Sequence, residues 1–97
     1  MYLTLIAQRI REALPAGVKV PDDSDSLFLL YALLATATGT NTTLCDIHNA
    51  WAIWQVSKNP SHRALVPFEK LTVGKREEDK PFLEATLRVA GEIASES

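Results

Sequence analysis

The chain has 97 residues, of which 46% are hydrophobic and 23% are charged, and its formal net charge is −2 at pH 7. This length predicts one domain spanning residues 1–97, with the ordinary composition of a globular protein. A sequence pI near 5.6 argues against a DNA or RNA partner, because proteins that bind nucleic acids usually carry a basic surface. The only cysteine is Cys45, which excludes an intramolecular disulfide and favours a cytoplasmic location.

No part of the sequence predicts a membrane segment or a signal peptide. The most apolar stretch, LFLLYALLATA at residues 27–37, is much shorter than the roughly 20 residues that a spanning helix needs. The first fifteen residues lack both a basic start and a cleavage site. We therefore expect no membrane partner.

Two helices are predicted in the first half of the chain. Over residues 2–14, apolar residues recur at helical spacing until PAG, residues 15–17, ends the pattern. Over residues 24–38, large apolar side chains surround the helix axis, which is typical of a central, buried helix. Gly39 is expected to terminate this second helix.

Two more helices are predicted at residues 42–57 and 79–94, joined by an irregular loop at about 58–74. Thr42 or Thr43 is expected to cap the third helix, and Asp46 suits its first turn. Pro67 makes part of the loop extended, whereas TVGKREED, residues 72–79, is expected to form a turn or a short helical turn. The predicted fold is therefore all-α: a small four-helix module with an irregular, partly extended loop packed on it.

Residues capable of catalysis or metal binding are too few to predict either function. Cys45, His48 and His62 are potential metal ligands, but a structural zinc site needs four ligands, usually in paired motifs. Cys45 and His48 are three residues apart on a helix, yet nothing marks an oxyanion hole beside them. We expect no metal, no cofactor and no enzymatic activity, and we expect Cys45 to be a small buried side chain.

A basic segment follows the two tryptophans of the third helix. Residues 58–76 contain half of the ten Lys and Arg residues and a single acid, Glu69; the basic residues are Lys58, Arg63, Lys70, Lys75 and Arg76. Such a loop beside indoles can bind an anion that carries an aromatic base, although a solvated loop explains the same charges. Trp51 falls in the apolar stripe and is expected in the core. Trp54, nearer the loop, is the expected contact residue.

Three segments in a fixed order carry a family resemblance: HNAW (48–51), SHRALVPFEKL (61–71) and KREEDKPF (75–82). Together, residues 47–83 resemble the ryanodine-receptor repeat, a small module found in tandem in those calcium channels and singly in bacterial and phage proteins. A Gly-Trp-x-Tyr-Gly-like segment that is usual in the family is replaced here by AIWQVSKNPSH, residues 52–62. The whole chain is also similar to short proteins of actinobacteria and their phages.

The resemblance implies a helical module with a family-like core at about 42–94, in which Leu65, Phe68 and Leu71 anchor the loop to the core. It also implies a homodimer, because tandem repeats pair about a two-fold axis. The channel repeats are associated with adenine nucleotides, and single modules with sensing or sequestering nucleotide-derived defence signals. His48, on the helix one turn from the loop, is expected to form a hydrogen bond with that loop or with a ligand.

The sequence thus predicts a non-enzymatic, dimeric module that binds or sequesters a nucleotide or a nucleotide-derived immune signal, as a phage anti-defence protein would. The alternative is a protein–protein interaction module without a small ligand. The predicted ligand contacts are the following eight residues: Trp54, His48, His62, Arg63, Lys58, Lys70, Tyr31 and Trp51.

Overall fold

The computed structural model describes residues 1–96 as an all-α domain, with no strand among them. Its elements in chain order are α1 (Tyr2–Ala13), α2 (Asp25–Ala37), η1 (Gly39–Asn41), α3 (Leu44–Lys58), η2 (Phe68–Lys70), α4 (Val73–Glu78) and α5 (Lys80–Glu96), where η denotes a 3-10 turn. The predicted class and the four predicted helices are confirmed. The predicted turn after the loop is a separate six-residue helix, α4.

Local signals in the sequence set the helix ends. Leu14, which precedes Pro15, is extended, so α1 ends there. Gly39 directly follows Thr38, the C-cap residue of α2, and has a φ of +57°. Glycine adopts this left-handed conformation without strain. Thr43 and Asp46 form a capping box at the start of α3: each side chain accepts a hydrogen bond from the other residue's backbone N–H, at 3.2 and 2.9 Å.

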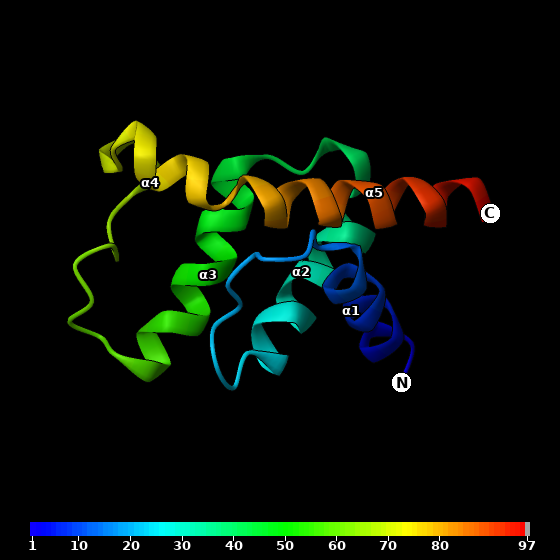
Figure 1. Ribbon diagram of the computed structural model, residues 1–97, viewed down its shortest axis with the longest axis horizontal. Coiled ribbons are helices and arrows are strands. Elements are labelled where there is room, and N and C mark those ends of the chain that lie inside the picture. The colour runs from blue at the N-terminus through cyan, green and yellow to red at the C-terminus, as the bar shows by residue number, and fades with distance from the viewer. Residues whose placement is uncertain (97) are drawn as a thin grey trace.

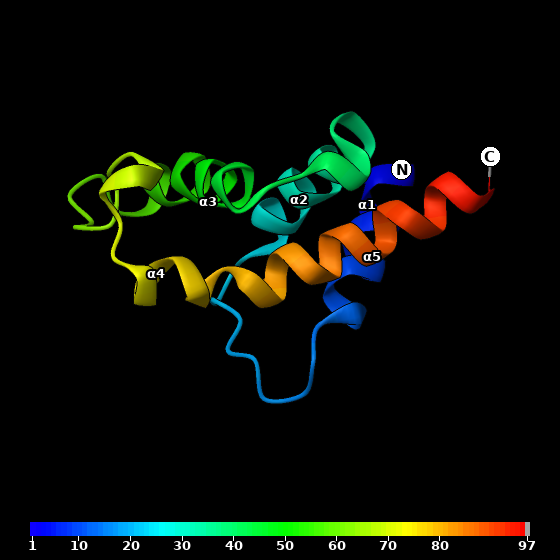
Figure 2. The same cartoon turned by 90° about the horizontal axis from the view of Figure 1, so that it is seen from above.

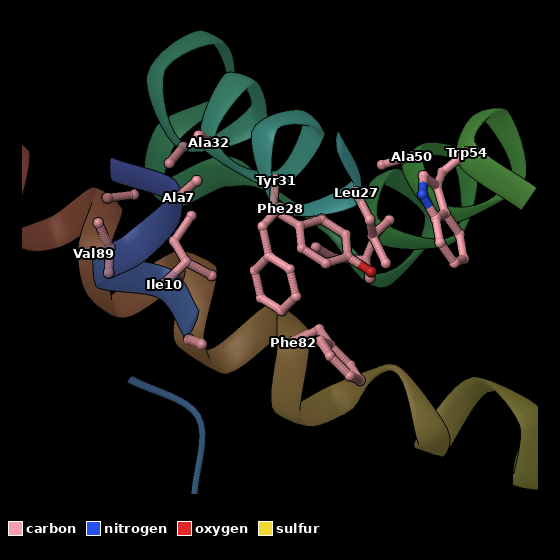
Figure 3. Close-up of a cluster of buried hydrophobic side chains, with 14 residues drawn as sticks. Ala7, Ile10, Leu27, Phe28, Tyr31, Ala32, Ala50, Trp54, Phe82 and Val89 are labelled. Atoms are coloured by element: carbon pink, nitrogen blue, oxygen red, sulfur yellow. The ribbon is translucent and has the colours of Figure 1, made fainter. Parts of the chain in front are cut away.

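The core is built around α2, which contacts α1, α3 and α5. Two aromatic contacts join α2 to α5: the ring centroids of Phe28 and Tyr31 lie 6.3 and 5.9 Å from that of Phe82 (Figure 3). The buried residues along α2 are Leu27, Phe28, Tyr31, Ala32 and Ala35. Burial on several sides of one helix confirms that α2 is central.

The two tryptophans of α3 occupy the opposite positions from those predicted. Trp54 is only 7% exposed and belongs to the core cluster (Figure 3). Trp51 is half-buried and packs against that cluster. Both residues lie on the apolar stripe of one helix, so spacing alone did not distinguish them. Packing of α3 against α2 and α5 buries the indole of Trp54, whose contact with a ligand stays a prediction.

The helices are distributed unevenly along the molecule, whose principal extents are 40 × 26 × 25 Å. Helix α5 runs from the α4 end toward the C-terminus, with α1 and α2 against its C-terminal part and α3 and α4 at the opposite end (Figures 1 and 2). The irregular segment 59–72 extends beyond α3 at that end (Figure 1). No helix within residues 1–96 is long and apolar enough to cross a membrane.

The irregular segment is fixed to α3 by one buried histidine. His48 Nε2 donates a hydrogen bond to the backbone carbonyl of Val66 at 2.7 Å, as expected of a residue one turn from the loop. Phe68 packs between His48, at 6.4 Å between ring centroids, and the guanidinium of Arg76, at 4.6 Å. Leu65, Phe68 and Leu71 are only half-buried and lie outside the core cluster, so the expectation that they reach the core is wrong.

Candidate functional site

A cleft opens where α3, the irregular segment and the α4–α5 junction meet. It has two lobes that share Trp51, Glu78 and Asp79. The polar lobe, of about 190 Å³, is lined by His48, Trp51, His62, Ala64, Leu71, Lys75, Glu78 and Asp79. The apolar lobe, of about 550 Å³, is lined by Val18, Lys19, Pro21, Leu27, Tyr31, Trp51, Glu78, Asp79 and Phe82. A volume of 550 Å³ lies within the range of small-molecule sites.

Three aromatic rings form one wall of the polar lobe. Trp51 stacks on His48, with ring centroids 5.7 Å apart and planes inclined at 22°. His62 meets Trp51 edge-on, at 5.1 Å and 81°. Since Trp51 is half-buried, part of its indole remains open to the cleft. This wall offers a flat aromatic surface on which a planar ring can stack.

The hydrogen bonds of the two histidines determine which ring nitrogens remain available. A carbonyl oxygen only accepts, so the bond to Val66 places a proton on Nε2 of His48 and leaves Nδ1 as an acceptor in the neutral ring. His62 Nδ1 accepts from the backbone N–H of Ala64 at 3.1 Å, which leaves the proton of the neutral ring on Nε2. In the neutral form of each ring, His48 therefore keeps Nδ1 as an acceptor and His62 keeps Nε2–H as a donor.

Asp79 is the carboxylate that both lobes share, and it lies between α4 and α5. The backbone fixes its position: its N–H donates to the carbonyl of Arg76, and its own carbonyl accepts from the N–H of Leu83. Within residues 1–96 its half-buried carboxylate has no hydrogen-bond or ion-pair partner. Burial raises the pKa of Asp79 above its ordinary 3.8; Glu78 adds to this effect and His48 opposes it.

Tyr31 provides a second polar group without a partner. Its side chain is 1% exposed, and no residue in the described part of the chain forms a hydrogen bond with its hydroxyl. The hydroxyl points away from Ala7 and Val89, out of the middle of the core cluster (Figure 3). Burial, and then the charge of Asp79, raises the pKa of Tyr31 well above its ordinary value, so the phenol is neutral and can donate or accept.

The formal charges that line the cleft cancel. Lys19 and Lys75 are balanced by Glu78 and Asp79. Lys75 also pairs with Glu78, at 3.6 Å between Nζ and Oε2. Lys19 has no ion pair within residues 1–96. The cleft therefore lacks the excess of positive charge that a polyphosphate site would need.

The structure brings four of the eight predicted contact residues into the cleft: His48, Trp51, His62 and Tyr31. The other four, Trp54, Lys58, Arg63 and Lys70, line neither lobe, and their contact with a ligand stays a prediction. Lys58 lies over the Trp54 ring, with Nζ 5.4 Å from the centroid, and Arg63 and Lys70 are exposed to solvent. Of the five basic residues at positions 58–76, only Lys75 lines the cleft.

The sequence analysis did not select Glu78 and Asp79, which both lobes share. They end TVGKREED, residues 72–79, for which only a turn or a short helical turn was expected. Their place in the cleft depends on residues of other elements, such as Tyr31 and Trp51, which no local pattern records.

Cys45 and His48 do not form a catalytic pair. Cys45 Sγ accepts a weak hydrogen bond from Asn49 Nδ2 at 3.7 Å, while His48 Nε2 bonds to Val66. Cys45 is half-buried, not fully buried as expected. No group of three or more potential metal ligands forms among residues 1–96, so Cys45, His48 and His62 are not assembled into a site.

The chain belongs to the family described as Domain of unknown function (DUF7701), whose model matches residues 1–91. All residues that line the cleft fall within the matched range. Comparisons with curated proteins and with solved structures found no match.

Proposed function

We propose that this DUF7701 protein is a non-enzymatic module that binds a nucleotide or nucleotide-derived ligand in the cleft. The observation that carries the proposal is the partly exposed side chain of Trp51, which lines both lobes together with the unpaired carboxylate of Asp79, while the unpaired phenol of Tyr31 lines the apolar lobe. Stacking of a base on an aromatic side chain is worth about 1–3 kcal/mol. Buried polar groups without partners add orientation and specificity.

The charges of the cleft favour recognition through the base over recognition through phosphates. Lys19 is the only cation there without an ion pair within the described residues, so it is the candidate partner for one anionic group of the ligand. The resemblance to the ryanodine-receptor repeat supports the same ligand class. It also supports a homodimer and a role in sequestering a nucleotide-derived defence signal, as in a phage anti-defence protein.

Calorimetric titration of the full chain with nucleosides, mononucleotides, cyclic nucleotides and ADP-ribose tests the proposal. We expect at least one of these compounds to bind, and Trp51→Ala to weaken that binding about tenfold, from the loss of stacking. Trp54→Phe is the matched control, because Trp54 lines neither lobe, and its affinity should stay within about twofold of the wild type. If the folded protein binds none of these compounds at millimolar concentration, the proposal is wrong.

A second candidate function, a protein–protein interaction module, is favoured by one separate observation. The outer side of α3 and the irregular segment form a shallow groove of about 560 Å³, in which Ile53 is 63% exposed and Val56 is 50% exposed. Exposed apolar surface of this kind often marks an interface. Light scattering of the wild type and of the double variant Ile53→Glu, Val56→Glu tests this candidate. A dimeric wild type and a monomeric variant support an interface. If both proteins are monomeric, self-association through this face is excluded.

A further inference from the structure

The polar groups at the junction of the two lobes are mostly acceptors. Asp79 has two carboxylate oxygens without partners, and they line both lobes. Lys75, the cation that lines the polar lobe with them, already pairs with Glu78. A ligand that fills this junction therefore has to supply hydrogen-bond donors, because an unpaired acceptor that loses its water is costly.

The shape of the junction restricts where those donors lie. Trp51 and Asp79 line both lobes, so a planar group stacked on the indole lies in the same cleft as the carboxylate and can turn one edge toward it. A carboxylate accepts two parallel hydrogen bonds when the donors are adjacent and in one plane. Guanine offers such a pair at N1–H and the 2-amino group, whereas adenine offers one amino group beside a ring acceptor.

We infer that Asp79 is the specificity-determining residue of the cleft and accepts two adjacent N–H donors from a planar ligand, of which guanine is the expected source. The inference rests on the proposed function for the choice of a nucleobase. The same donor pair occurs in a guanidinium group, so a small guanidinium compound is the other source of this chemistry. Tyr31, 1% exposed and without a hydrogen-bond partner in the described residues, lies in the adjoining lobe and is able to donate to or accept from the remaining polar atoms of the ligand.

Calorimetric titration with four probes tests this inference: guanosine, inosine, adenosine and agmatine. Inosine is the matched probe, since it keeps the N1–H of guanosine and lacks only the 2-amino group. We expect guanosine to bind about tenfold or more tightly than inosine, since loss of one donor leaves a carboxylate oxygen unpaired. Adenosine should bind more weakly than guanosine by a similar or larger factor.

Asp79→Asn should reduce the ratio of guanosine to inosine affinity to near one, because the amide keeps only one acceptor atom. Glu84→Gln is the control: it is the same acid-to-amide change at an exposed position that lines neither lobe, and it should leave the ratio unchanged. Circular dichroism and thermal melting confirm that both variants fold. The Asp79 side chain forms no hydrogen bond within residues 1–96, so its replacement removes no native contact of that kind.

The outcomes separate the two proposals. Equal binding of guanosine and inosine, or a preference that survives Asp79→Asn, would overturn the role of Asp79 while leaving nucleotide binding in place. Binding of agmatine that Asp79→Asn abolishes, without binding of any nucleoside, would support the donor pair and overturn the nucleotide assignment. Absence of binding by all four probes would overturn both.

Discussion

The positions of the two tryptophans lead to the sharpest prediction about stability. Trp54 is 93% buried, as its exposed fraction of 7% shows, and its Nε1 is a buried donor without a partner in the described residues. Replacing a buried tryptophan with alanine costs about 3–5 kcal/mol. The unpaired Nε1 already costs about 1–3 kcal/mol in the wild type, and its removal recovers part of this. We expect Trp54→Ala to lower the free energy of unfolding by about 2–3 kcal/mol.

Trp51→Ala is the matched comparison on the same helix. Trp51 is half-buried and its ring contacts are with His48 and His62, so its loss should cost about 1 kcal/mol. Urea unfolding followed by far-ultraviolet circular dichroism measures both variants. A loss of 2–3 kcal/mol corresponds to a Tm lower by about 10–20 °C in a domain of this size. If Trp51→Ala destabilises the protein as much as Trp54→Ala, the distinction between a core indole and a cleft indole is refuted.

Three further predictions concern the cleft and its surroundings. Burial raises the pKa of Asp79, so the folded state binds this proton more tightly than the unfolded state. The free energy of unfolding of the wild type should therefore fall, relative to that of Asp79→Asn, as the pH rises from 3.8 through the raised pKa. Urea titrations of both proteins between pH 4 and 8 measure this difference, and a constant difference would contradict the prediction. His48→Ala leaves the Val66 carbonyl without its partner and should lower the free energy of unfolding by about 2–4 kcal/mol. Trypsin should then cleave faster after Arg63 and Lys70, because the irregular segment is released from α3. Unchanged cleavage would show that other contacts hold the segment. Arg63→Glu with Lys70→Glu should leave ligand affinity within about twofold, since neither residue lines the cleft; calorimetry that shows a tenfold loss would restore the phosphate-binding role predicted from the sequence.

Local sequence was sufficient for the helices and their ends, because the interactions that set them are short-ranged. Pro15 after an extended Leu14, Gly39 in a left-handed conformation and the Thr43–Asp46 capping box each involve residues a few positions apart. The apolar residues that surround the α2 axis likewise indicated its central position, since a helix that is apolar on every side has to be covered on every side.

The candidate site depended on contacts that the sequence does not record. Tyr31 comes from α2, Trp51 from α3 and Asp79 from the α4–α5 junction, and only the packing of these helices places them around one cleft. The basic segment had the composition of a phosphate site, yet of its five cations only Lys75 lines the cleft, and Lys75 is paired with Glu78.

The segment IHNAWAIW shows where the two sources of information separate. Periodicity determined that His48, Trp51 and Trp54 lie on one helix and that this helix buries an apolar stripe. Tertiary structure decided that Trp54 is covered while Trp51 faces the cleft, and that His48 holds the irregular segment through Val66. The physical reason is that a helical repeat fixes the angle of each side chain around its own axis, whereas burial depends on which neighbouring helix lies at that angle.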